Sequence, residues 1–135
     1  MTQGSPRRLK ILVIEDEDRV RRVVVDLLGA LGHTVLQAEG GREGLARLEA
    51  GESVDLVLTD LSIPEMSGWE VVKAVKGRWP HIRVGLITGT PEASAEGVEM
   101  VDFVIAKPVT LAGLREGISQ GPPPHQQTPG NAEEK

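Results

Sequence analysis

The sequence contains no cysteine and no tyrosine, and its only aromatic residues are Trp69, Trp79 and Phe103. Without cysteine, the chain forms no disulfide, no thiolate zinc site and no cysteine nucleophile. A stacking platform for single-stranded nucleic acid needs several aromatic side chains, so the composition argues against one. The formal net charge of −5 argues against broad binding to phosphate backbones. We therefore expect no direct contact with nucleic acid.

No apolar run approaches the roughly 18 residues that span a bilayer, and the polar segment 1–8 lacks the apolar core of a signal peptide. We expect a soluble, cytoplasmic protein with no membrane partner. Segment 1–8 is predicted to be a flexible lead. Segment 119–135 is rich in Pro, Gln and Gly and has no Val, Leu, Ile or aromatic residue, so a disordered tail is predicted. This leaves one domain, over residues 9–118.

Short apolar segments alternate with amphipathic segments along this domain. Strands are predicted at residues 10–15, 34–38, 55–60, 82–88 and 101–106, each followed by a helix. In the first helix, offsets of three and four residues predict one apolar stripe of Val20, Val23, Val24, Leu27, Leu28 and Leu31. The alternation predicts an α/β fold: a doubly wound, five-stranded parallel sheet with flavodoxin-like order 2-1-3-4-5 and helices on both faces.

Several helix starts carry their own signals. Ser67 and Glu70 have the spacing of a capping box, and Thr110 is expected to cap the last helix. Thr90 before Pro91 predicts the start of a helix that runs to Met100. This helix is rich in alanine and is predicted to be short.

Polar residues stand where the predicted strands end. Glu15 and Asp16 end the first strand, Asp60 the third, Thr88 the fourth, and Lys107 the fifth. Ligands of open α/β sheets bind outside the carboxyl ends of the strands, so we expect these side chains to gather at one edge.

This set of residues favours phosphoryl chemistry on a metal. The oxygen ligands, with neither cysteine nor histidine among them, select Mg²⁺ or Mn²⁺ over zinc. Lys107 provides a point charge for a phosphate, and Thr88 provides a hydroxyl. A carboxylate in the position of Asp60 can attack a phosphoryl group, with the developing charge stabilised by the metal and by Lys107.

The four strand-end motifs together resemble those of response regulator receiver domains of two-component signalling. They are Ile14-Glu15-Asp16-Glu17, Asp60 to Gly68, Leu86 to Gly89, and Ala106-Lys107-Pro108, and the resemblance covers residues 9 to 118. It implies that Asp60 accepts a phosphoryl group from a histidine kinase or a histidine phosphotransfer protein. It also implies that Glu15, Asp16, Asp60 and the Ser62 carbonyl hold Mg²⁺, that Thr88 moves toward the phosphate, that Lys107 pairs with it, and that the Lys107–Pro108 bond is cis.

Two positions depart from the family pattern. Glu15 stands where the family usually has Asp, and Val104 stands where it often has an aromatic switch residue. The ring of Phe103 is expected to point to the opposite face of the sheet. These departures, with the short helix after Pro91, argue against dimerisation through the face of the last strand. A monomer that docks partners through its first helix and active-site loops is therefore expected.

A pseudo-receiver that binds partners without phosphate remains an alternative. A phosphohydrolase needs a second Asp two residues after its nucleophile, where this chain has Ser62. A dinucleotide site fails because Glu and Asp follow the first strand in place of Gly. The chain is thus expected to be a signalling domain that catalyses only its own phosphorylation and dephosphorylation, and not an enzyme acting on a metabolite.

The remaining charged and basic side chains are expected at the surface. Arg19, Arg21 and Arg22 are predicted to form a solvated face of the first helix. Val25 lies off the apolar stripe and is expected to be partly exposed. The three histidines are separated in sequence and are expected to be surface residues, not metal ligands.

Overall fold

The computed structural model describes residues 8–89 and 100–119, and its centre is a parallel sheet with strand order β2-β1-β3-β4-β5. The strands are β1 Lys10–Ile14, β2 Thr34–Ala38, β3 Leu56–Asp60, β4 Arg83–Thr88 and β5 Phe103–Ala106. All neighbouring strands pair in parallel. The predicted fold class and strand order are confirmed.

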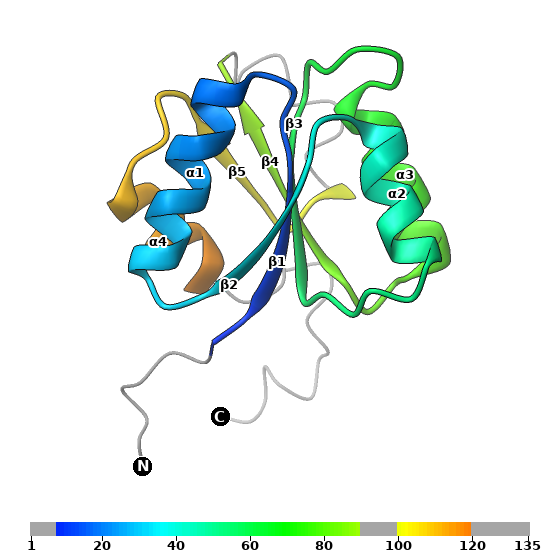
Figure 1. Ribbon diagram of the computed structural model, residues 1–135, viewed down its shortest axis with the longest axis horizontal. Helices are drawn as coiled ribbons and strands as arrows, with labels where there is room; N and C mark the ends of the chain where they lie inside the picture. The colour runs from blue at the N-terminus through cyan, green and yellow to red at the C-terminus, as the bar shows by residue number, and fades with distance from the viewer. Residues whose placement is uncertain (1–7, 90–99, 120–135) are drawn as a thin grey trace, which may run out of the picture.

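Helices cover both faces of this sheet, as predicted (Figure 1). The described helices are α1 Asp18–Ala30, α2 Gly41–Glu49, α3 Gly68–Arg78 and α4 Leu111–Ser119. Helices α1 and α4 lie on one face, and α2 and α3 lie on the other (Figure 1). None of these helices is long and apolar enough to cross a membrane. The predicted helix from Pro91 to Met100, the lead and the tail fall almost entirely on residues outside the described ones and stay predictions.

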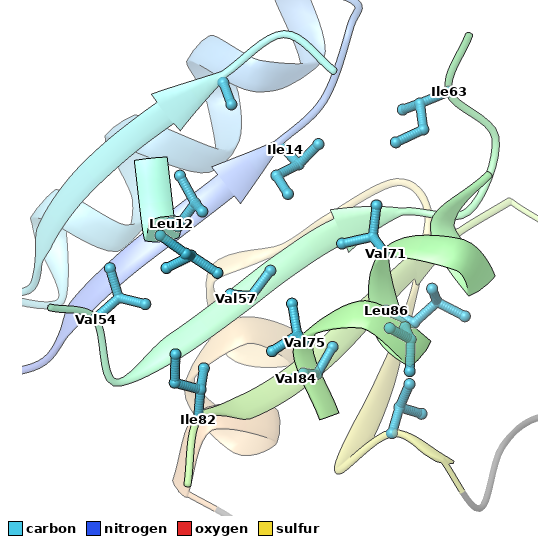
Figure 2. Packing of buried hydrophobic residues seen from close by; sticks show 14 residues of the cluster. Leu12, Ile14, Val54, Val57, Ile63, Val71, Val75, Ile82, Val84 and Leu86 are labelled. Atoms are coloured by element: carbon cyan, nitrogen blue, oxygen red, sulfur yellow. The ribbon is translucent and has the colours of Figure 1, made fainter. Parts of the chain in front are cut away.

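Two hydrophobic clusters hold the helices to the sheet. Successive strand side chains point to opposite faces, so β1 contributes Leu12 and Ile14 to the cluster under α2 and α3, and Ile11 and Val13 to the cluster under α1 and α4. Figure 2 shows the first cluster, in which residues of β1, β3, β4 and α3 meet. Val57 of β3 is among them. The sheet is therefore buried on both faces, which fixes the positions of the strand ends.

The same alternation separates the two residues at the start of β5. Phe103 belongs to the cluster under α1 and α4, whereas Val104 packs against the opposite cluster. The prediction that the ring of Phe103 points away from the side of Val104 is confirmed. Gly85 and Gly117 make room for this ring, since a Cβ at position 117 would lie 2.7 Å from its Cδ2 atom.

Local signals at the helix ends also act as predicted. The Ser67 hydroxyl accepts a hydrogen bond from the Glu70 amide, and the Glu70 side chain accepts one from the Ser67 amide, which completes the capping box. The Thr110 hydroxyl accepts a hydrogen bond of 3.0 Å from the Gly113 amide at the start of α4. After α1, Gly32 adopts a positive φ of 94° that a residue with a side chain rarely takes.

Two predictions on α1 are wrong. Val23 is predicted in the apolar stripe but is 48% exposed, and Arg21 is predicted on the solvated face but its side chain is only 12% exposed. A helix turns by about 100° per residue, so Val23 lies that far around the helix from the buried Val24. Arg21 lies about 60° from Val24 on the other side, at the margin of the stripe. Val25 is partly exposed, as predicted.

Candidate functional site

The carboxyl ends of four strands bring their polar residues to one edge of the sheet. Asp60 and Thr88 are the last residues of β3 and β4, whereas Glu15 and Lys107 directly follow β1 and β5. The parallel register carries all four to the same edge. Residues up to 92 positions apart in sequence, 107 − 15 = 92, are thus collected by the topology of the sheet.

Three carboxylates lie together at this edge. Glu15, Asp16 and Asp60 each offer an oxygen atom, and these atoms lie within 4.8 Å of one another. Glu15 is 1% exposed and Asp60 is 4% exposed, whereas Asp16 faces solvent. Two buried acids and one open acid therefore form a concentrated negative site with access from one side.

Lys107 partly neutralises this site. Its ammonium nitrogen lies 3.0 Å from Asp60 Oδ2 and 3.7 Å from Glu15 Oε1. Partial burial lowers the pKa of Lys107, but the hydrogen bond to Asp60 and the negative charges of Asp60, Glu15 and Glu17 outweigh it, so the pKa lies above its usual value. The Lys107–Pro108 peptide bond is cis, as the resemblance implied.

Among the carboxylates of the site, Glu15 has a raised pKa. The pKa of Glu15 is raised to about 7, chiefly because the side chain is buried. The hydrogen bond of 3.0 Å that Oε2 accepts from the Glu17 amide lowers this pKa, whereas the negative charge of Asp60 raises it. The other oxygen, Oε1, is buried and accepts no hydrogen bond from the described residues. The Lys107 ammonium, 3.7 Å away, is too far to donate a hydrogen bond to it, so a closer cation would stabilise this buried oxygen.

These residues fit a small divalent cation. The donor set contains only oxygen atoms, which suits Mg²⁺ or Mn²⁺, and such ions use one or two carboxylates and keep several waters. Glu15 Oε1, which accepts no hydrogen bond from the described residues, and the solvent-facing Asp16 offer oxygen atoms for such coordination beside Asp60.

Two further predicted site residues lie beside Asp60. Thr88 is 2% exposed, and its carbonyl accepts a hydrogen bond of 2.9 Å from the Lys107 amide. The Ser62 amide donates a hydrogen bond of 3.4 Å to Asp60 Oδ1. The structure thus brings both residues to the site, while the roles of the Thr88 hydroxyl and the Ser62 carbonyl stay predictions.

Arg21 is a residue at this edge that sequence reasoning missed. Its guanidinium donates to the Glu15 carbonyl at 2.9 Å, to Asp18 Oδ1 at 2.6 Å and to Gln37 Oε1 at 3.2 Å. The signal available in the sequence was its place at the margin of the helical stripe, which aims it toward the neighbouring strand.

An apolar groove of about 230 Å³ opens next to Lys107, between α1 and the loop after β5. We call it the α1 groove, and it is lined by Arg19, Val20, Val23, Lys107, Pro108 and Val109. Among the described residues, Val23 is the exposed large hydrophobic side chain. A larger cavity of about 500 Å³ involves Leu9 and Asp55 at the opposite edge, where the strands begin, and is remote from the carboxylates.

Comparisons with known proteins agree with this geometry. Residues 11–119 match the family described as response regulator receiver domain. The chain is similar to a chemotaxis protein CheY homolog of Campylobacter jejuni, with 36% identity over 116 residues that cover 82% of this chain and 89% of that protein.

Solved structures show the same likeness. A response regulator receiver domain protein from Clostridium thermocellum superposes with a TM-score of 0.73 at 34% identity, covering 81% of this chain and 90% of that chain. The response regulator protein TrrA from Thermotoga maritima, in complex with Mg²⁺ and BeF, superposes with a TM-score of 0.75 at 26% identity, covering 81% and 95%.

Proposed function

The chain belongs to the response regulator receiver family, and we propose that it accepts a phosphoryl group on Asp60 from a phosphohistidine donor in a two-component phosphorelay. One observation carries this proposal. Asp60 Oδ2 lies 3.0 Å from the Lys107 ammonium, while the carboxylates of Glu15 and Asp16 lie close to it on the same edge. A nucleophile, a cation for the phosphoryl group and a pair of metal-binding acids are thus assembled.

The transfer follows from this arrangement. A carboxylate oxygen of Asp60 attacks the phosphorus atom, so an O–P bond forms while the P–N bond to the donor histidine breaks and its electron pair stays on the imidazole. Lys107 then pairs with a phosphoryl oxygen in place of Asp60 Oδ2. Thr88 supplies a hydroxyl from the end of β4, next to Lys107. Water later attacks the phosphorus atom, the P–O bond to the Asp60 carboxylate breaks, and inorganic phosphate leaves; the same groups that stabilise the transferring phosphoryl group promote this dephosphorylation.

Glu15, Asp16, Asp60 and the Ser62 carbonyl are the groups that would hold Mg²⁺ or Mn²⁺. Such an ion neutralises phosphoryl oxygens and lowers the repulsion between them and the carboxylates. The likeness to the receiver TrrA, whose structure contains Mg²⁺ and BeF, supports this assignment.

The α1 groove is the proposed docking surface for the phosphohistidine partner. It lies directly beside Lys107 and exposes Val23, and Arg19 and Arg22 on the same helix are accessible to acidic side chains of a partner. A histidine kinase or histidine phosphotransfer protein that covers this groove would bring its histidine to Asp60.

Phosphorylation is proposed to switch partner interactions while the domain stays monomeric. Val104 replaces the aromatic side chain common in the family and is half-buried against the core, so the side of β5 on which Val104 lies offers no large ring to move. Size-exclusion chromatography with beryllofluoride and Mg²⁺ checks this directly. A tight dimer under these conditions would overturn it.

The test of the function is autophosphorylation from acetyl phosphate, followed by intact mass spectrometry. The wild type is expected to gain the mass of one phosphoryl group in Mg²⁺ and to gain none in EDTA. Asp60→Asn is expected to gain none in either buffer. No gain in the wild type would refute the proposal and favour a domain that binds partners without phosphate.

A further inference from the structure

Arg21 joins three elements at the metal-binding edge. Nη1 donates to the carbonyl of Glu15 at the end of β1, Nη2 donates to Asp18 in the first turn of α1, and Nε donates to Gln37 in β2. Nη2 also lies 3.9 Å from a carboxylate oxygen of Glu39. The loop between β1 and α1 is thereby tied at both of its ends.

That loop carries two of the proposed metal ligands. Glu15 is the residue whose carbonyl Arg21 holds, and Asp16 follows it on the solvent side. The Glu15 side chain is bound within the same loop through the Glu17 amide, and the Glu17 carbonyl accepts the Arg21 amide. A change at Arg21 therefore acts on the backbone that aims both carboxylates.

The Arg21 side chain is also largely buried and has several hydrogen-bond partners. It is only 12% exposed, and a planar guanidinium with several bonds keeps one orientation better than an ammonium does. The carboxylates of Asp18 and Glu39, which form ion pairs with Arg21, are exposed. They lie outside the group formed by Glu15, Asp16 and Asp60. The contacts of Arg21 therefore position the loop, and they do not neutralise the Asp60 carboxylate.

We infer that Arg21 is a positioning residue for the divalent cation: by fastening the β1–α1 loop to β2, it preorganises Glu15 and Asp16 for metal binding. This inference rests on the proposed function, since it concerns the same metal site. The direction of the change in Mg²⁺ affinity on removing Arg21 distinguishes a positioning role from a purely electrostatic effect. Removing a positive charge near a cation site strengthens cation binding by electrostatics, whereas removing a positioning residue weakens it.

The experiment titrates MgCl₂ into the full chain and follows the amide shifts of the β1–α1 loop by NMR, which also shows that each variant is folded. Arg21→Met keeps the apolar stem, and Arg22→Met is the matched control because it removes the same charge from the next, exposed position. Arg21→Met is expected to raise the dissociation constant for Mg²⁺ about 10-fold. Arg22→Met is expected to leave it unchanged or slightly lower.

Arg21→Lys keeps the charge and decides the case if Arg21→Met does not fold. Because one ammonium cannot replace the three-armed guanidinium contact, Arg21→Lys is expected to weaken Mg²⁺ binding as well. Folded Arg21 variants that bind Mg²⁺ as tightly as the wild type would overturn the positioning role. The proposed function fails separately, if the wild type shows no Mg²⁺ response that Asp16→Asn reduces.

Discussion

The Lys107 ammonium donates a hydrogen bond of 3.0 Å to Asp60 Oδ2, across a separation of 47 residues in the sequence. One oxygen of the proposed nucleophile is therefore already paired with a cation. The same ammonium lies 3.7 Å from Glu15 Oε1, so it stands between the nucleophile and a proposed metal ligand. In the proposed function, a divalent cation would share these carboxylates with Lys107, and a phosphoryl group would give Lys107 a new partner.

Lys107→Met is expected to change metal binding and phosphate binding in opposite directions. Loss of the nearby charge removes repulsion, so Mg²⁺ alone should bind about threefold more tightly. Loss of a charged hydrogen bond should weaken binding of beryllofluoride in Mg²⁺ by about 10-fold or more. Calorimetry or NMR titration measures both constants. Lys73→Met, at an exposed position of α3, is the control. An equal loss of affinity for Mg²⁺ and for beryllofluoride would argue against a Lys107 ammonium that stands between the nucleophile and a metal ligand.

The raised pKa of Glu15 predicts a specific dependence of stability on pH in the absence of metal. Burial raises this pKa from 4.5 to about 7, so Glu15 contributes stability that is fully present below pH 4.5 and lost as the pH rises through 7. Glu15→Gln removes this contribution and should flatten the fall of the melting temperature between pH 5 and 8. An unchanged slope in Glu15→Gln, measured in EDTA, would assign the dependence to other groups.

Two glycines of α3 provide a matched pair of substitutions. A Cβ at Gly68 would collide with the Asp60 carbonyl oxygen and lie 2.7 Å from the Cα atom of Leu61, whereas a Cβ at Gly77 would meet nothing within 4 Å. Gly68→Ala should lower the free energy of unfolding by about 1–3 kcal/mol and slow phosphorylation of Asp60. Gly77→Ala should raise it by about 0.5–1 kcal/mol. Urea titration checks both signs, and equal effects would contradict the packing argument.

Val23→Glu tests the α1 groove as the partner surface. Burying a charge against the partner should reduce phosphotransfer from a phosphorylated histidine protein at least fivefold, or about 1 kcal/mol. The donor is the histidine protein that phosphorylates the wild type fastest. Phosphorylation by acetyl phosphate, which needs no protein surface, should stay unchanged and serves as the internal control. Unaltered transfer from the protein donor would place the docking surface elsewhere.

The sheet is predictable from the sequence because its strands have clear local signals. Segments such as 10–15 and 55–60 are apolar on both faces, and each is bounded by polar or turn residues. Topology rules then place the carboxyl ends of all the parallel strands at one edge, so the sequence alone predicts that Glu15, Asp60 and Lys107 lie together. The capping box at Ser67 and Glu70 is a local signal, which explains why it was readable.

The contacts that depend on three-dimensional packing were not predictable in the same way. Arg21 was interpreted as a surface residue because composition does not show that its guanidinium reaches Gln37 in the next strand. Val23 is predicted in the core because spacings of three and four residues define an apolar stripe. They do not fix how the helix is rotated about its axis, and so do not fix which margin of the stripe faces solvent. The orphaned Glu15 Oε1 depends on which donors surround it, and a pattern in the sequence does not supply them.

The most direct test of the phospho-acceptor is to locate the acyl phosphate. Borohydride reduction of the protein phosphorylated in Mg²⁺ converts an aspartyl phosphate to homoserine, which peptide sequencing by mass spectrometry places at one residue. The account predicts homoserine at position 60 and not at position 16. Modification at another aspartate, or at none in a folded protein saturated with Mg²⁺ and acetyl phosphate, would contradict it.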